Sequence, residues 1–256
     1  MAKTAKPKVG FYDVTGCQGC LLSVIFNEEE ILDIINAIDI KEFRFIMKEK
    51  YVGPLDICFI EGAVVNKEDE EIIKKLRARS KIVIALGACA THGNIPSLRN
   101  FAKSKDIEYL KYKKEHDGMQ DLDPKPITDY IKVEYSLPGC PPDSDEIKTF
   151  IKDLLLGKEF RNYPDPVCKE CRLYEGGCLI DEKRICLGPI TKGGCKAICT
   201  TNGFECYGCR GTTEDANFKE YFNMLNKKGF TNIEIKKHME TFVALEINEK
   251  LKSQKL

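Results

Sequence analysis

Apolar and polar residues alternate along positions 1–157 in two distinct ways. Short runs of consecutive apolar residues predict five strands, at 9–14, 43–47, 55–60, 81–86 and 131–136. Apolar residues at helical spacing predict helices between them, at 21–38, 66–79 and 142–156. Strands that alternate with helices indicate an α/β domain built on a mostly parallel, doubly wound sheet. The charged stretch 101–128 fits neither pattern, and we interpret it as a solvated insertion.

The pattern changes after Gly157. Between Gly157 and Gly211 the chain has eight cysteines, nine glycines and little hydrophobic periodicity. Such a segment buries too little apolar surface to fold alone, so it needs cross-links, which bound clusters would supply as binding energy coupled to folding. Helix, strand and helix patterns return at 218–225, 230–235 and 242–251. We therefore predict three parts: residues 1–157, a cysteine-rich domain at 158–213, and a C-terminal helix and strand extension at 214–256.

Charge and hydropathy narrow the possible partners. Forty basic and forty acidic residues leave no net charge, so no overall field favours nucleic acid. No apolar run approaches the ~20 residues of a membrane helix. Residues 1–8 have no apolar core of an export signal, so we expect a cytoplasmic protein. Abundant lysine and glutamate hint at a thermophilic source.

Thirteen cysteines are the unusual feature of the composition. A cytoplasmic protein of 256 residues has a core large enough to fold without disulfides, and cellular thiols keep such bonds reduced. Hyperthermophiles are an exception to that rule. Thiolate ligation of metal is the better interpretation.

Four cysteines follow the carboxyl ends of predicted strands. Cys17 and Cys20 come after the first strand, Cys89 after the fourth and Cys140 after the fifth. Those ends converge on one crevice in an open α/β sheet, so the four thiols are expected to meet there. Glycines beside them let the backbone approach a bulky cluster. A thioredoxin-type redox pair would use only Cys17 and Cys20, whereas a structural zinc site could also take all four thiolates.

The other cysteines form a second group. Its members are Cys168, Cys171, Cys178, Cys186, Cys195, Cys199, Cys206 and Cys209. The simplest partition is sequential, with the first four in one site and the last four in another, although interleaved pairings exist in ferredoxins. Cys58 remains, inside a predicted buried strand, where a free cysteine packs as a small hydrophobe.

Four motifs together resemble a known family. They are Gly10–Cys20 (GFYDVTGCQGC), Ile60–Val64 (IEGAV), Gly87–Pro96 (GACATHGNIP) and Leu137–Pro142 (LPGCPP). In order and spacing they are similar to the small subunit of nickel-iron hydrogenases and, more distantly, to the complex I 20 kDa-type subunit. The likeness covers about the first 150 residues, and the cysteine quartets extend it to about residue 211.

This resemblance implies a flavodoxin-like first domain and three 4Fe-4S clusters. Cys17, Cys20, Cys89 and Cys140 would hold the proximal cluster. Cys168, Cys171, Cys178 and Cys186 would hold the distal cluster, and Cys195, Cys199, Cys206 and Cys209 the medial one. Cys168 replaces the family's usual histidine and Cys199 its usual proline, which points to the cytoplasmic group of sulfhydrogenase delta subunits and methyl-viologen-reducing or deazaflavin-reducing hydrogenases of anaerobic archaea.

The resemblance also implies a division of roles. A nickel-iron large subunit would split dihydrogen, and this chain would pass electrons to an acceptor-side flavin or iron-sulfur subunit, without a catalytic residue of its own. Glu61 either lies near the proximal cluster or is a solvated carboxylate at a strand end. A complex I-like subunit of another oxidoreductase is the alternative, and the eight-cysteine segment disfavours it. A zinc-stabilised interaction protein is a third possibility.

Overall fold

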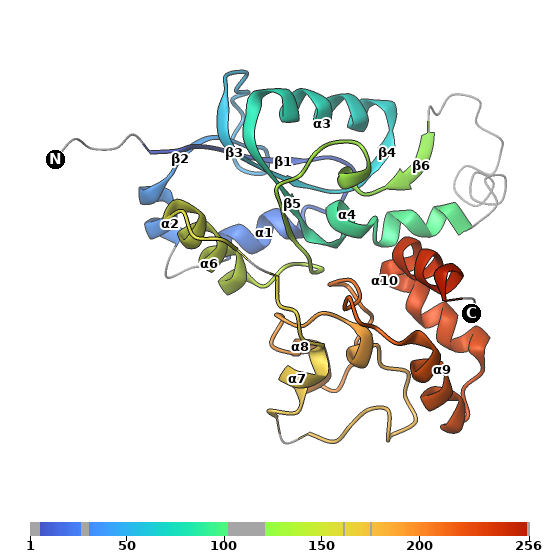
Figure 1. Cartoon of the computed structure of the whole chain (residues 1–256). Coiled ribbons are helices and arrows are strands. Elements are labelled where there is room, and N and C mark those ends of the chain that lie inside the picture. Colours follow the sequence, from blue (N-terminus) through green and yellow to red (C-terminus); the bar gives the residue numbers. More distant parts are fainter. Residues whose placement is uncertain (1–5, 27–30, 102–120, 161, 175, 255–256) are drawn as a thin grey trace. The chain divides into compact units, whose positions relative to one another are not determined.

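The computed structural model describes residues 6–26, 31–101, 121–160, 162–174 and 176–254 (Figure 1). The chain divides into two compact units, Met1–Phe160 and Arg161–Leu256. All thirteen cysteines lie within the described residues, and none of them is in a disulfide bond. No described helix has the length and apolar character that crossing a bilayer requires.

The first unit contains a sheet of five parallel strands. They are β1 (Lys8–Asp13), β2 (Asp39–Phe43), β3 (Leu55–Glu61), β5 (Ser80–Leu86) and β7 (Tyr135–Leu137). Neighbours in the sheet follow the order β2-β1-β3-β5-β7, and each neighbouring pair is parallel. The predicted α/β class with a parallel sheet is therefore confirmed.

Helices cover both faces of this sheet (Figure 1). Successive residues of a strand face opposite ways, so Phe11 and Phe59 pack on the side of α1 (Gly19–Ile25) and α6 (Ser144–Leu155). Tyr12 and Ile60 pack on the other side, against α3 (Lys67–Arg79). Both faces are apolar because both are covered, which is why the strands read as continuous apolar runs.

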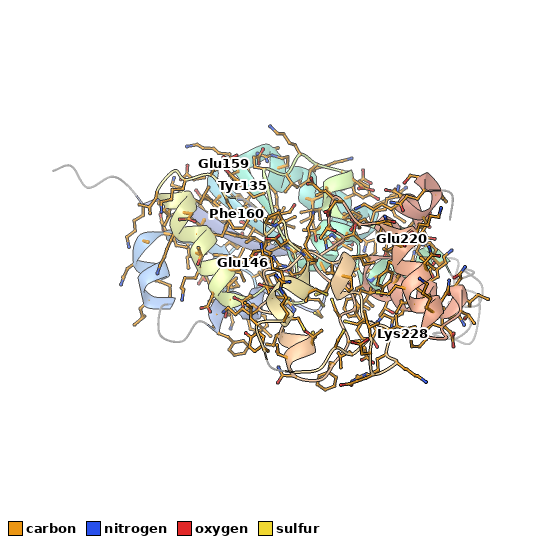
Figure 2. The ribbon with its side chains drawn as sticks, turned by 60° about the horizontal axis from the view of Figure 1, so that its bottom comes forward. Tyr135, Glu146, Glu159, Phe160, Glu220 and Lys228 are labelled. Carbon is orange, nitrogen blue, oxygen red and sulfur yellow. The ribbon has the colours of Figure 1, made fainter. Side chains whose placement is uncertain are left out.

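Aromatic rings close the end of the first unit. Phe150 of α6 packs edge-on against Phe59, with ring centroids 6.1 Å apart, and against Tyr135 of β7 at 5.4 Å. Phe160 also packs edge-on against the Phe150 ring, with ring centroids 4.8 Å apart. Figure 2 labels Tyr135 and Phe160. This contact places residues after 157 in the same core as the sheet.

Several element boundaries differ from the sequence prediction. The second strand ends at Phe43 instead of beginning there. The fifth begins at Tyr135, because the 3-10 turn η2 (Ile127–Asp129) is followed by an irregular segment at 130–134. The segment predicted as one helix contains α1 and α2 (Ile31–Ala37). β4 (Val64–Asn66) pairs antiparallel with β6 (Asp121–Lys125), and most of the predicted solvated insertion lies outside the described residues.

The second unit has short helices around its cysteines and two longer ones after them. They are α7 (Val167–Cys171), η3 (Gly188–Ile190), α8 (Ile198–Thr201), α9 (Phe218–Lys227) and α10 (Asn232–Ser253). The predicted strand at 230–235 is wrong. Thr231 instead caps α10 in a reciprocal capping box with Glu234.

One core joins the cysteine-rich segment to the tail. Leu187 and Ile190 of the cysteine-rich segment belong to the same buried cluster as Phe218, Met239 and Ile247 of the last two helices. The tail therefore supplies apolar surface that the segment of cysteines and glycines lacks. Folding of this segment depends on the tail as well as on any metal.

We predict that Cys58→Ala leaves metal content unchanged. Cys58 is fully buried in β3, and burial raises the pKa of its thiol to about 12, so the side chain is a packed, protonated group. Removing the sulfur should lower the free energy of unfolding by about 1 kcal/mol. Iron analysis and thermal denaturation of the purified variant test both statements. Loss of iron would show that our partition of the cysteines is wrong.

Candidate metal centres

The first four cysteines lie where the sequence predicted, past the carboxyl ends of β1, β5 and β7. Cys20 is in the first turn of α1, and Cys89 is in α4 (Gly87–His92), the short helix that follows β5. Burial raises the pKa of the Cys20 thiol, and Glu61 and then the other three thiols of the group raise it further. The structure thus brings Cys17, Cys20, Cys89 and Cys140 together.

Backbone hydrogen bonds hold the loops that carry these thiols. Ala88 N, beside Cys89, donates to Gly139 O, beside Cys140, at 2.7 Å. Ala63 N, just after β3, donates to Thr15 O at 2.8 Å, in the loop that leads to Cys17. These hydrogen bonds join the loops that carry the thiols to one another.

Glu61, at the end of β3, is hydrogen-bonded to the turn that bears Cys20. Its side chain is 1% exposed, and Oε2 accepts a hydrogen bond from Leu21 N at 2.8 Å. Burial raises the pKa of this carboxyl, while the backbone donors around Cys20 lower it. Of the two interpretations made from the sequence, the solvated carboxylate is wrong. Glu61 lies against the turn that bears Cys20.

Asn94 is a site residue that the sequence reasoning missed. It is 1% exposed, and Nδ2 lies 3.5 Å from Cys89 Sγ and 3.5 Å from Cys140 Sγ. Its Oδ1 is buried and has no hydrogen-bond partner among the described residues. Asn94 has a left-handed φ of 39°, which favours asparagine or glycine after a helix. Its place in the motif Gly93-Asn94 was the available signal.

Gly87 lets the backbone at the end of β5 pack directly against the sulfur of Cys20. Its φ is +87°, and a Cβ built there would lie 2.2 Å from Cys20 Sγ. Only glycine lets the backbone of β5 approach that sulfur. Burial raises the pKa of Cys89 to about 11, although Asn94 lowers it, so this thiol gives up its proton when a metal takes the proton's place.

Four cysteines of the second unit line one cavity. The cavity has a volume of about 230 Å³, and its walls include Cys168, Cys171, Cys178 and Cys186. Burial, followed by the other three thiols, raises the pKa of Cys168 to about 12. Gly188 brings the backbone close as well, since a Cβ there would lie 3.2 Å from Cys168 Sγ.

The last four cysteines are in adjoining loops. Cys199 is in α8 and interacts electrostatically with Cys195, as Cys209 does with Cys206. Phe204 N donates to Cys199 O at 2.9 Å, which joins the chain before Cys206 to that helix. Cys206 N also donates to Cys186 Sγ at 3.4 Å, a direct link between the two sets of the second unit.

The donor sets fit iron-sulfur clusters. Thiolates around a cubane bind different irons, so they stand farther apart than the ligands of one ion. Cysteine thiolates are the ligands that hold such a cluster, and a hydrogen bond to a ligand sulfur, as from Asn94 Nδ2, tunes its potential.

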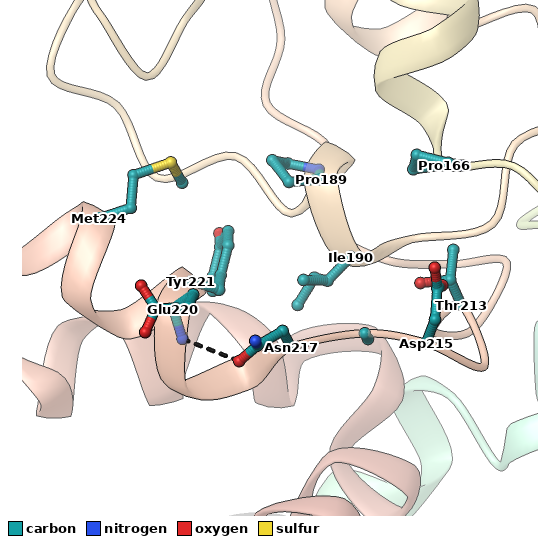
Figure 3. Close-up of a pocket in the computed structure, with 10 residues that line it drawn as sticks. Pro166, Pro189, Ile190, Thr213, Asp215, Asn217, Glu220, Tyr221 and Met224 are labelled. Carbon is teal, nitrogen blue, oxygen red and sulfur yellow. Dashed lines mark hydrogen bonds between the residues drawn. The ribbon is translucent and has the colours of Figure 1, made fainter.

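A separate pocket of about 480 Å³ lies in the second unit (Figure 3). Pro166, Pro189, Glu220 and Tyr221 are among the residues that line it. The hydroxyl of Tyr221 donates to the carbonyl of Cys186 at 2.8 Å. The pocket wall is thereby connected to the backbone of one predicted cluster ligand.

Comparison with known proteins gives one family match and several relatives. Residues 17–154 match the family described as NADH ubiquinone oxidoreductase, 20 Kd subunit. The chain is 37% identical to sulfhydrogenase 2 subunit delta of Pyrococcus furiosus, over 92% of this chain and 98% of that one. It is 34% identical to a vhu subunit of the F420-non-reducing hydrogenase of Methanocaldococcus jannaschii, over 82% of this chain and 84% of that one.

Solved structures agree with these relatives. A chain of an NAD+-reducing [NiFe]-hydrogenase in the H2-reduced state has a TM-score of 0.56 and 30% identity, over 62% of this chain and 97% of that one. A chain of the [NiFeSe]-hydrogenase of Dm. baculatum has a TM-score of 0.58 over 81% of this chain and 95% of that one. At 18% identity, the second likeness shows the fold alone.

We predict that Gly87→Ala removes the cluster of the first unit. The new Cβ and the Cys20 sulfur cannot occupy the same space, so the purified variant should lose about four irons per chain. Gly157→Ala is the matched control, because Gly157 also has a positive φ, of 68°, but faces open space. That change should cost about 1–2 kcal/mol of backbone strain and no iron. Equal iron content in the two variants would contradict this role of Gly87.

Proposed function

Because this chain belongs to the small-subunit family of nickel-iron hydrogenases, within the wider family of the 20 Kd subunit of NADH ubiquinone oxidoreductase, we propose that it relays electrons through three 4Fe-4S clusters. It is an electron-transfer subunit of a hydrogenase complex. The reaction with dihydrogen belongs to the nickel-iron large subunit, and this chain has no catalytic residue. When the five strands of the parallel sheet are numbered among themselves along the chain, their order in the sheet is 2-1-3-4-5. This is the flavodoxin-like order, and we assign the first unit to that fold.

The sulfur-lined cavity of the second unit supports this proposal most strongly. Cys168, Cys171, Cys178 and Cys186 line one cavity of about 230 Å³, so four thiols meet at a single space. A complex I-like role uses only the first unit, and the family match to residues 17–154 stops short of this cavity. The Pyrococcus relative, in contrast, aligns with 92% of the chain.

We assign the clusters by their ligands. Cys17, Cys20, Cys89 and Cys140 hold the proximal cluster, which faces the large subunit. Cys168, Cys171, Cys178 and Cys186 hold the distal cluster, and Cys195, Cys199, Cys206 and Cys209 the medial one. When bound, each cluster accepts and releases one electron, while the protein sets its potential through hydrogen bonds to sulfur, local charge and burial.

The residues of this chain have defined parts in the relay. Asn94 donates to two proximal sulfurs, and Glu61 holds the turn that bears Cys20. The hydrogen bond from Cys206 N to Cys186 Sγ, at 3.4 Å, gives the medial and distal sites a short bonded connection. Electrons leave through the distal site, from which we expect a flavin or iron-sulfur subunit to take them.

The surface around the distal site supports that expectation. Leu173 is 79% exposed and Tyr174 is 47% exposed, two and three residues after Cys171. Exposed apolar side chains beside a redox centre suit a protein partner.

We further propose that the complex works in the cytoplasm.

We expect Cys168→His to slow electron transfer to the acceptor while leaving the activation of dihydrogen unchanged. Histidine can ligate iron, so the cluster should assemble with an altered potential, and the complex should still contain about 12 irons per small subunit. Isotope exchange between dihydrogen and water needs no relay and should persist, whereas reduction of the physiological acceptor should slow. Cys58→Ala, which removes a thiol outside the three sets, should leave both activities unchanged.

Two results would contradict the proposal. A wild-type chain with zinc in place of iron would exclude the relay altogether. Loss of isotope exchange by Cys168→His in an intact, nickel-loaded complex that still reduces its acceptor from an artificial donor would exclude the distal position of this site.

A further inference from the structure

Arg210 is among the largest fully buried side chains of the protein. It follows Cys209 directly and is 2% exposed. Arginine keeps its charge at any ordinary pH, and burying a cation is costly unless nearby groups compensate it. A buried arginine beside a predicted cluster ligand therefore requires an explanation other than packing.

A single peptide group lies between Arg210 and a carboxylate. Arg210 Nε donates to Gly193 O. Gly194 N, on the other side of the same peptide bond, donates to Glu170 Oε2 at 2.9 Å. Lys196 N donates to Glu170 Oε1 at 3.3 Å. The peptide of Gly193 and Gly194 thus has a cation at its oxygen and an anion at its nitrogen.

Both glycines are needed for this arrangement. A Cβ on Gly194, whose φ is +94°, would lie 2.6 Å from Arg210 Nη2. A Cβ on Gly193 would lie 2.8 Å from the Tyr163 ring and 3.0 Å from Glu170 Oε2. The two glycines thus let the backbone approach both charged groups closely, in the turn that leads into Cys195.

Two opposite charges flank the peptide that leads into Cys195: Arg210 lies at the oxygen of Gly193 and Glu170 at the nitrogen of Gly194. Arg210 is shielded from water, so solvent screens its field less than that of a surface arginine. Reduction of a cluster adds one negative charge, which a fixed neighbouring cation stabilises.

We propose that Arg210 sets the reduction potential of the cluster held by Cys195, Cys199, Cys206 and Cys209, raising it by a buried positive charge that Glu170 partly offsets. This inference rests on the proposed function, because it requires a cluster at that site. Arg210 is a positioning and charge-bearing residue, and it takes no part in ligation. It makes this site a better electron acceptor than its cysteines alone would provide.

The test is an EPR-monitored redox titration of the purified hydrogenase complex. Arg210→Gln keeps a hydrogen-bond donor and removes the charge. At the wild-type midpoint potential, the ratio of reduced to oxidised cluster should fall about tenfold, which is about 59 mV for one electron. Glu170→Gln should move the same couple in the opposite direction, a sign that loss of packing alone would not produce.

Arg184→Gln is the matched control. Arg184 also lies beside a cysteine loop and pairs with Glu205 at 2.6 Å, but its side chain is 35% exposed. Solvent screens this pair, so its loss should change the ratio less than about twofold. An effect as large as that of Arg210→Gln would show that burial confers no special role, and would overturn the inference.

Iron analysis separates failure of this inference from failure of the proposed function. A wild-type chain that lacks the third set of about four irons would refute the cluster itself. A complete iron content with an unmoved couple in Arg210→Gln and Glu170→Gln would refute only the role of Arg210. Should Arg210→Gln not assemble, Arg210→Lys keeps the charge and should keep the wild-type ratio, and a tenfold fall in that variant would refute the role as well.

Discussion

The approach of the Cys20 sulfur to the backbone of Gly87 is the contact on which the first site depends. Four thiols from loops more than a hundred residues apart meet only because parallel strands end at one edge of the sheet. The sulfur of Cys20 lies so close to the main chain that no side chain fits at the contact point. Gly87, with its positive φ and its missing Cβ, provides that space at the end of β5.

In the second unit the cysteines are positioned without a sheet. Its cysteines lie in short helices and turns, and the apolar surface that stabilises them comes from α9 and α10. Tyr221 of α9 reaches back to the carbonyl of Cys186, and Glu170 reaches from α7 to the turn before Cys195. The tail and the charged side chains thereby hold loops that would otherwise rely on metal alone.

Much of this arrangement could be predicted from the sequence. The alternation of strands and helices gave the α/β class, and strand ends gave the meeting point of the first four cysteines. The setting of Cys58 within an apolar run indicated a packed thiol. The helix predicted at 66–79 is α3, and the Asn66 side chain caps it by accepting a hydrogen bond from Asp69 N at 2.8 Å. The family resemblance is confirmed by the relatives. Each of these features could be inferred from short stretches of sequence and their order along the chain.

Other features depend on long-range contacts that a pattern does not reveal. Charged residues are usually exposed, so neither Glu61 nor Arg210 could be identified as buried from its neighbours in the chain. Asn94 reaches sulfurs on two separate loops. The alternation of apolar residues at 230–235 favoured a strand, whereas the capping box of Thr231 and Glu234, also present in the sequence, starts a helix. Packing of that helix against the cysteine segment decided the outcome.

The most direct measurement is a map of iron anomalous scattering from crystals of the anaerobically purified complex. Three cubane-shaped peaks should appear in this chain, each bonded to one of the three sets of four cysteines, with Cys58 apart from all of them. A peak at the zinc edge in any set, or a cluster that takes ligands from both sets of the second unit, would contradict this account.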